Sequence, residues 1–263
     1  EGGHSVSFLR RYPGLHVVGV ETDASMMERA RSRLTEFADR VTFVHDWFDA
    51  FFASTSEHFD LILMDLGISM FHFSLSTRGF SFKADEPLDM RLNQASGRTA
   101  ADLVNELGET ELADLIYRFG EERYSRRIAD RIVRERDHEP FTTTRALAEA
   151  VWKSVPANYR HGRIHPATRT FQALRIAVND ELGRVERVIP FALNALRPGG
   201  RLGIIAFHSL EDRIVKHSFR AAAQEEGFSV VTKKPVVPSD DEARANPAAR
   251  SAKLRVIERC GEA

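Results

Sequence analysis

Asp65 and Ser69 stand where a catalytic site would form. Asp65 directly follows the buried apolar run 59–64, and Ser69 comes shortly after it. In open parallel sheets ligands bind beyond the carboxyl ends of the strands, so both side chains are candidates for chemistry. The simpler alternative for Asp65 is that its carboxylate caps the helix that follows.

A glycine turn at the start of the chain indicates a nucleotide site. Glu1, Gly2, Gly3 and His4 run into an apolar helical stretch, and the strand 16–21 then ends in Glu21. Glycines let the backbone approach a ligand closely, and a carboxylate at a strand end can accept hydrogen bonds from a ribose diol. An ordinary turn is the alternative for two adjacent glycines.

Composition limits the classes of protein that fit. A chain of 263 residues with 43% hydrophobic residues can form one α/β domain with a smaller insert. It has no apolar run of the ~20 residues that span a bilayer and no signal-peptide pattern, so we expect a cytoplasmic protein without membrane contact. Cys260 is the single cysteine, which excludes internal disulfides and cysteine-based zinc sites. The histidines lack ligand spacing, so we expect no metal.

Strand and helix patterns alternate over much of the chain. Buried strands are expected at 16–21, 41–44, 59–64 and 201–207, with helices at 24–37 and 210–223. The alternation predicts a doubly wound α/β sheet. Residues 228–232 and 254–257 predict an antiparallel hairpin joined by the loop 235–250. The spacing in 171–196 predicts one long helix, bent at Pro190 and ended by residues 198–200.

Residues 92–166 interrupt this alternation. They show no clear strand and predict helices at 100–107, 111–119, 122–136 and 144–154. We therefore expect an inserted helical domain at 92–166 between two parts of one domain, 1–91 and 167–263. Residues 150–179 contain no acid, so a polyanion is a plausible partner there, although a solvated basic face is the alternative.

Five motifs make the sequence similar to a known family. They are 65–69, 78–91, 165–175, 207–213 and 246–251. In order and over nearly the whole chain, they resemble the bacterial ribosomal RNA small-subunit methyltransferase H family. The resemblance implies a class I, Rossmann-like methyltransferase fold with S-adenosylmethionine as cofactor. It also implies methylation at N4 of a cytosine in the decoding centre of 16S rRNA, with the small ribosomal subunit as partner.

The resemblance also implies roles for single residues. Gly2, Gly3 and His4 would contact the cofactor, Glu21 would hold its ribose and Phe48 would flank its adenine. Asp65 would lie beside the methionine end or the reacting amine. His72 stands where the family often has Gln, so its contact with the cofactor departs from the pattern. The family's first strand and its acidic approach to the glycine loop are not found, so we expect an N-terminally truncated chain that aggregates or binds cofactor poorly alone.

The chemistry of the residues favours methylation of an amine. The lone pair of cytosine N4 is delocalised into the ring, so an acceptor must hold an amine proton during attack; Asp65, Ser69 or a backbone carbonyl of their loop could do so. Methylation at C5 would need a thiolate, and Cys260 lies in a tail without catalytic context.

Arg160, Arg163 and Arg169 are the candidates for RNA contact within the acid-free stretch. The arginines between 118 and 136 alternate with acids and predict a salt-bridged helix surface. Of the aromatics at 71, 73, 80 and 82, we expect at most one to stack a base. His208 and Ser209 lack the glycine elbow of a hydrolase, and structural or substrate-positioning roles are expected.

Two other functions fit parts of the sequence. One is an RNA-binding ribosome-assembly factor with a degenerate methyltransferase fold; Gly2, Gly3, Glu21 and Asp65 argue against it. The other is a nicotinamide-dependent oxidoreductase, whose Gly-x-Gly-x-x-Gly spacing the visible glycine loop does not match. The sequence leaves the oligomeric state open, a homodimer included.

Overall fold

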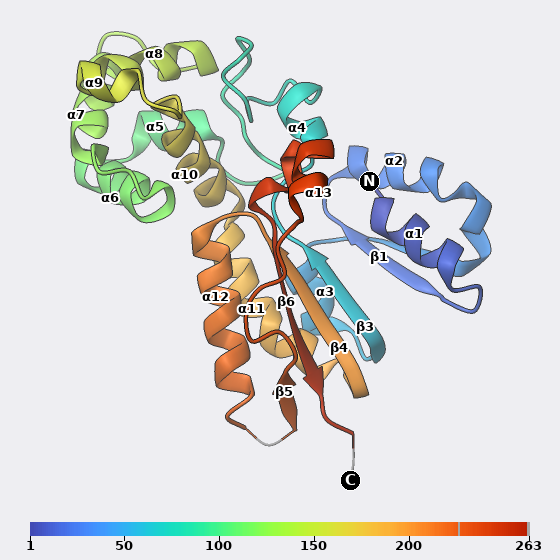
Figure 1. The fold of residues 1–263 in the computed structure, drawn as a ribbon. Helices are drawn as coiled ribbons and strands as arrows, with labels where there is room; N and C mark the ends of the chain where they lie inside the picture. Colours follow the sequence, from blue (N-terminus) through green and yellow to red (C-terminus); the bar gives the residue numbers. More distant parts are fainter. Residues whose placement is uncertain (226, 262–263) are drawn as a thin grey trace. The chain divides into compact units, whose positions relative to one another are not determined.

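The structure is a computed structural model that describes residues 1–225 and 227–261 (Figure 1). It divides into two compact units. The first consists of Glu1–Gly67 and Leu182–Ala263, and the second of Ile68–Glu181. The helical insert expected at 92–166 lies inside the second unit, and its bounds as a separate domain stay a prediction.

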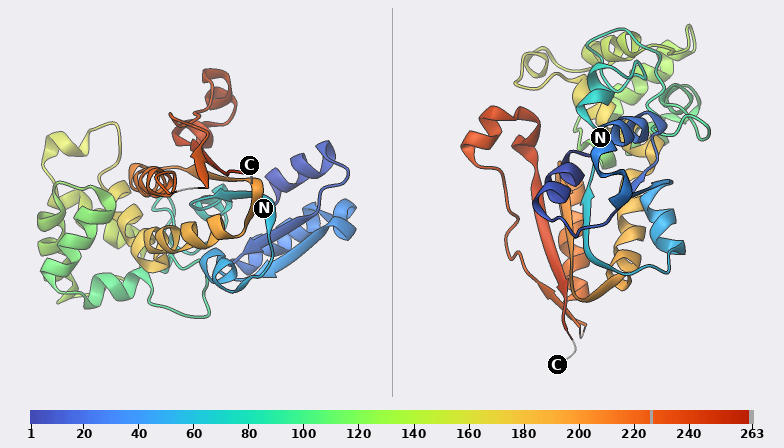
Figure 2. Two further views of the ribbon diagram at one scale, coloured as in Figure 1. Left: turned by 90° about the horizontal axis from the view of Figure 1, so that it is seen from below. Right: turned by 90° about the vertical axis from the view of Figure 1, so that its right-hand side faces the viewer.

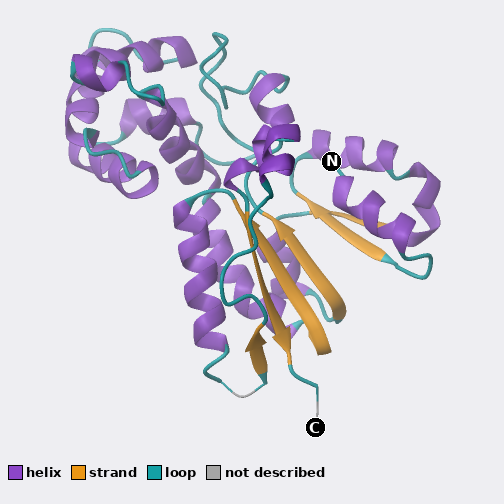
Figure 3. Ribbon diagram, viewed as in Figure 1, coloured by secondary structure: helices purple, strands orange, loops and turns teal. Residues whose placement is uncertain are grey.

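The strands of the first unit form two sheets (Figure 3). In one sheet, β1 (Val17–Glu21) pairs with β2 (Val41–His45) in parallel. In the other, β3 (Phe59–Asp65) pairs in parallel with β4 (Leu196–Ala206). β6 (Lys253–Arg259) follows antiparallel to β4, and β5 (Phe228–Val230) is antiparallel to β6. The α/β class and the terminal hairpin predicted from sequence are confirmed.

β1 and β3 are edge strands. Within the part of the chain that the structure describes, each is paired on one side only, and no ladder joins the two sheets. The carboxyl ends of β1 and β3 carry Glu21 and Asp65, so the sheets place both candidate carboxylates at strand ends.

Helices bury the apolar sides of these sheets. The helical segments of the first unit are α1 (Gly3–Arg11), α2 (Ala24–Arg33), η1 (Thr35–Arg40), α3 (Phe48–Ser54), α11 (Glu181–Asn194, whose first residue ends the second unit), α12 (Ser209–Ala222), α13 (Asp240–Ala245) and η2 (Pro247–Ser251). Val188 of α11 and Phe219 of α12 join Ile204 of β4 in one buried cluster. Leu9 and Leu34 anchor a smaller cluster beside β1 and β2.

The long helix expected at 171–196 is two helices. α10 (Ala167–Asn179) ends at Asp180, whose φ of 49° is left-handed and whose N–H bonds back to Ala177 and Ile176. Pro190 lies inside α11 without ending it. α11 ends at Asn194, and residues 198–200 belong to β4 instead. The prediction was wrong because the helical spacing of apolar residues continues across Asp180, whereas the backbone leaves the helical conformation at that residue.

The second unit is a bundle of helices (Figure 2). Its helices are α4 (Met70–Ser74), α5 (Ala100–Glu106), α6 (Glu109–Gly120), α7 (Ser125–Arg136), α8 (Thr144–Ser154), α9 (Ala157–Arg160) and α10. Ile116, Ile128 and Leu174 lie in its fully buried core. α6 and α10 pack very closely, since a Cβ on Gly120 would lie 2.5 Å from the carbonyl oxygen of Arg169. The helices expected within the insert are confirmed.

The loop expected at 235–250 contains short helices. α13 and η2 form there, with Ser239 as the N-cap of α13. Lys253, the first residue of β6, pairs with Ala206, the last of β4. The segment therefore enters the sheet at the end where β4 finishes. Among the helices of residues 1–225 and 227–261, none is long and apolar enough to cross a bilayer.

Candidate active site

The glycine turn opens helix α1. Gly2 is its N-cap, with a left-handed φ of 76° that glycine adopts without strain. A Cβ at this position would lie 3.0 Å from Leu34 Cδ1, so the turn also packs tightly on the end of α2. α1 has no side-chain cap bond and no acid in its first turn. Its first backbone N–H groups and the positive end of its dipole are therefore suited to an anion.

His4 and Asp65 bring the glycine turn to the end of β3. His4 Nε2 lies 3.5 Å from Asp65 Oδ2. Their side chains are 57% and 47% exposed, so the pair faces solvent or a ligand. The hydrogen bond to Asp65 raises the pKa of His4, outweighing partial burial. The alternative in which Asp65 caps the next helix is wrong, because Ser69 is the N-cap of α4.

Glu21 lies at the carboxyl end of β1 and shapes the turn after it. Its Oε1 accepts a hydrogen bond from the backbone N of Asp23 at 2.8 Å. Asp23 in turn caps α2 by accepting from the backbone N–H groups of Ser25 and Met26. Glu21 is half-buried, so its carboxylate is held in place at the strand end. This is the position in which a ribose diol could be bound.

Phe48 begins α3 and is half-buried against the large cluster of the first unit. Sequence reasoning missed its neighbours. Asp49 is buried and accepts from Arg184 at 2.6 Å and from Arg187 at 2.9 Å, while the Arg184 guanidinium lies 3.6 Å from the centre of the Trp47 ring. These contacts fix α3 to α11. No local pattern could have revealed them, since the partners are far apart in sequence.

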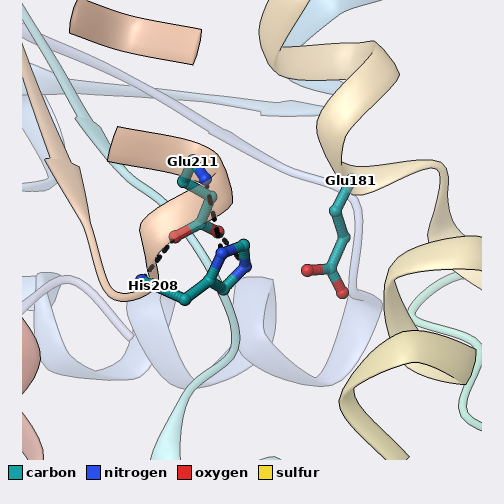
Figure 4. A group of neighbouring side chains, drawn as sticks. All are labelled: Glu181, His208 and Glu211. Carbon is teal, nitrogen blue, oxygen red and sulfur yellow. Dashed lines mark hydrogen bonds and ion pairs between the residues drawn. The ribbon is translucent and has the colours of Figure 1, made fainter. Parts of the chain in front are cut away.

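His208 and Glu211 form the start of α12, as Figure 4 shows. Glu211 is buried and accepts from the backbone N of Phe207 at 2.8 Å, while His208 Nδ1 accepts from the Glu211 N at 3.3 Å. Asp212 accepts from Lys253 and Arg255 of β6. Burial alone would raise the pKa of Asp212, but these two partners lower it. The motif 207–213 therefore caps α12 and joins it to β6, which agrees with the structural role expected for His208.

The other predicted site residues lie in the second unit. Ser69 Oγ accepts from the backbone N of Phe71 at 3.1 Å and so caps α4. His72 is buried, with its ring edge-to-face on Phe80 at 5.2 Å. A catalytic role for Ser69 and a cofactor contact for His72 remain predictions.

The candidate RNA-binding arginines differ in their surroundings. Arg160 donates to the carbonyls of Val155 and Lys153 at the end of α8. Arg169 donates to the carbonyl of Glu121 at the end of α6. Arg163 is exposed on the turn after α9. On α7 of the same unit, the ion pairs Arg131–Glu135 and Arg134–Asp130 confirm the predicted salt-bridged helix surface.

The sequence profile of the MraW methylase family matches residues 1–260. The chain belongs to this family. Ribosomal RNA small subunit methyltransferase H of Treponema denticola is 52% identical over 98% of the chain and 87% of its own length. The protein of that name from a Nostoc species is 50% identical, over 99% and 84%. A solved rRNA methylase from Streptococcus thermophilus aligns over 98% of the chain and 81% of its own length at 10% identity, with a TM-score of 0.44.

Because the chain belongs to a methylase family, its α/β fold is that of a methyltransferase. A methylase needs a methyl donor, and for this methylase it is S-adenosylmethionine. The residues at the start of α1 fit that cofactor, because its methionine end carries a carboxylate and the N–H groups of the first turn have no side-chain cap.

Proposed function

We propose that this methylase transfers a methyl group to N4 of a cytosine in the decoding centre of 16S ribosomal RNA, in the cytoplasm. The names of its curated relatives support the small-subunit RNA as substrate. The observation that carries the chemistry is the His4–Asp65 contact of 3.5 Å, which joins the glycine turn to the end of β3. It puts a carboxylate beside the place where the methionine end of the cofactor would bind.

Gly2, Gly3 and His4 would hold the methionine end of the cofactor at the start of α1. Glu21 would accept hydrogen bonds from the ribose hydroxyls, and Phe48 would lie beside the adenine. His72, which lies in the second unit, remains a separate prediction of a cofactor contact. Bound there, S-adenosylmethionine supplies an electrophilic methyl group on a sulfonium.

Asp65 would accept the proton of the reacting amine. An amine that gains this methyl group would have to lose one proton. His4 contacts Oδ2 of Asp65, so we assign the proton to Oδ1. His4 would orient the carboxylate, and Ser69 would hold the base near it. No other general base is required, because the carboxylate only needs to accept a proton as the nitrogen becomes positive.

The residues present favour an amine over the C5 carbon as the target atom. Methylation at the C5 carbon of cytosine would require a cysteine thiolate that adds to the ring. Cys260 is the single cysteine, and it is exposed just after β6. The candidate site on β3 offers a carboxylate instead. An exocyclic amine is the target that this chemistry favours.

Calorimetric titration separates this function from its rivals. We expect binding of S-adenosylmethionine and no heat from NAD. A protein that binds RNA but does not bind S-adenosylmethionine would instead be an assembly factor. A protein that binds NAD would be an oxidoreductase. Glu21→Gln is the matched variant: it should weaken cofactor binding while thermal unfolding stays close to that of the parent protein.

A further inference from the structure

Three rings in the helical unit contact one another in series, through one tilted and one stacked pair. His165 lies between Phe82 and Trp152, with ring centroids 4.7 Å and 5.3 Å apart and interplanar angles of 32° and 26°. Phe82 comes from the loop after α4, Trp152 from α8, and His165 from the turn before α10. Residues distant in the sequence thus build one aromatic ladder, defined as Phe82, His165 and Trp152.

The inner end of the ladder is fixed. Phe82 contacts the buried ring of Phe171 edge-to-face at 5.0 Å. His165 Nδ1 accepts a hydrogen bond from the backbone N of Ala167 at 3.2 Å, which holds the imidazole at the start of α10. Partial burial lowers the pKa of His165, which favours the neutral form of the ring. The ladder is therefore preorganised rather than formed by a ligand.

The outer end of the ladder reaches solvent. His165 is exposed and Trp152 is half-buried. The next ring contact beyond Trp152 is with His161, which is itself exposed and meets the indole edge-on at 6.0 Å. A core-packing role explains Phe82 and Phe171 well, but it does not explain why the ladder continues into an exposed imidazole and an indole.

Two exposed cations are close in sequence to the rings of this outer end. Lys153 follows Trp152 directly, and Arg163 lies on the turn between His161 and His165. Both side chains are exposed, and residues 150–179 contain no acid. Lys153 Nζ lies 3.6 Å from Glu149 on the exposed helix surface, and such an exposed ion pair competes weakly with a phosphate. An aromatic face next to exposed cations suits single-stranded nucleic acid.

We propose that the Trp152 end of the ladder stacks an unpaired base of the RNA substrate, with Lys153 and Arg163 on the flanking phosphates. This inference rests on the proposed function, which supplies RNA as the ligand. The stacked base would belong to a different nucleotide from the one that is methylated, and it would bind to the helical unit. Every base has a π face, so the platform selects unpaired RNA rather than a sequence.

The test uses the fluorescence of Trp152. In a Trp47→Phe background Trp152 is the single tryptophan, because the chain has 2. We expect an unpaired oligoribonucleotide to quench its emission and inorganic polyphosphate of equal charge not to do so. Trp152→Ala should weaken binding of the oligoribonucleotide by about tenfold, within the range for the loss of one stacked base, whereas Trp152→Phe should retain most of the affinity.

Tyr117→Ala is the matched control. Tyr117 is an aromatic 61% exposed on α6 of the same unit, and its removal should leave the affinity unchanged. Equal quenching by RNA and polyphosphate, or unchanged affinity in a folded Trp152→Ala variant, would overturn the stacking platform. If the parent protein still methylates 16S RNA in that case, the proposed function holds and only the stacking platform is wrong. If the parent protein binds no RNA at all, both proposals fail.

Discussion

His4 and Asp65 are 61 positions apart in sequence but meet at 3.5 Å between Nε2 and Oδ2. The contact connects the first turn of α1 with the carboxyl end of β3. Because both side chains are about half exposed, the pair contributes little to stability. Its position at a strand end instead points to a role in the site.

The first prediction concerns the titration of His4. The hydrogen bond to Asp65 raises the pKa of His4 above its ordinary value of 6.5, so Asp65→Asn should move it back towards that value. The contribution of protonated His4 to the free energy of unfolding is fully present below pH 6.5 and is lost as the pH rises through the raised pKa. Proton NMR of the imidazole measures the shift. An unchanged His4 pKa in the variant would show that the two side chains do not interact in solution.

The second prediction concerns catalysis. Asp65→Asn removes the proton acceptor, so methyl transfer should fall by about 100-fold or more, in the range for general base catalysis. Thermal unfolding should not change. Asp60→Asn is the matched control, because Asp60 lies at the other end of β3 and is exposed beside Arg197. Near-normal activity of Asp65→Asn with normal unfolding would remove Asp65 from the mechanism.

The sequence predicted the parts of the fold that periodicity controls. The strands ending at Glu21 and Asp65 and the helices of the insert follow directly from apolar spacing. The break at Asp180 was missed because a single left-handed residue leaves no periodic signal. The Asp49–Arg184 pair and the Phe82–His165–Trp152 ladder were also missed, since contacts between distant segments depend on tertiary packing.

The third prediction separates the basic residues of the helical unit. Arg163→Ala should flatten the dependence of RNA binding on salt by about one released counterion, because its side chain is exposed. Arg160→Ala and Arg169→Ala should instead lower the free energy of unfolding by about 1 kcal/mol each, since their guanidinium groups bond to helix-end carbonyls. Filter binding at several salt concentrations and thermal unfolding provide the two readouts. A normal salt slope in Arg163→Ala would direct the search for the RNA surface to residues 118–136.

The fourth prediction concerns the loop of the helical unit that begins at Arg78. Gly79 has a φ of 77°, and a Cβ there would lie 2.3 Å from the carbonyl oxygen of Pro87. Gly97 has a similar φ of 88° but open space around it. Gly97→Ala should cost about 1–2 kcal/mol from conformation alone, and Gly79→Ala should cost more because the loop must also shift. Equal losses in chemical denaturation would mean that the Gly79 contact does not constrain the loop.

The most direct test of the proposed function is the identity of the methylated nucleoside. The protein, S-adenosylmethionine carrying a labelled methyl group, and unmodified small subunits are incubated together, and the 16S RNA is digested to nucleosides for mass spectrometry. We predict labelled N4-methylcytidine from a single decoding-centre position, and none with Asp65→Asn. Labelled 5-methylcytidine, or label in another base, would contradict amine methylation by this site.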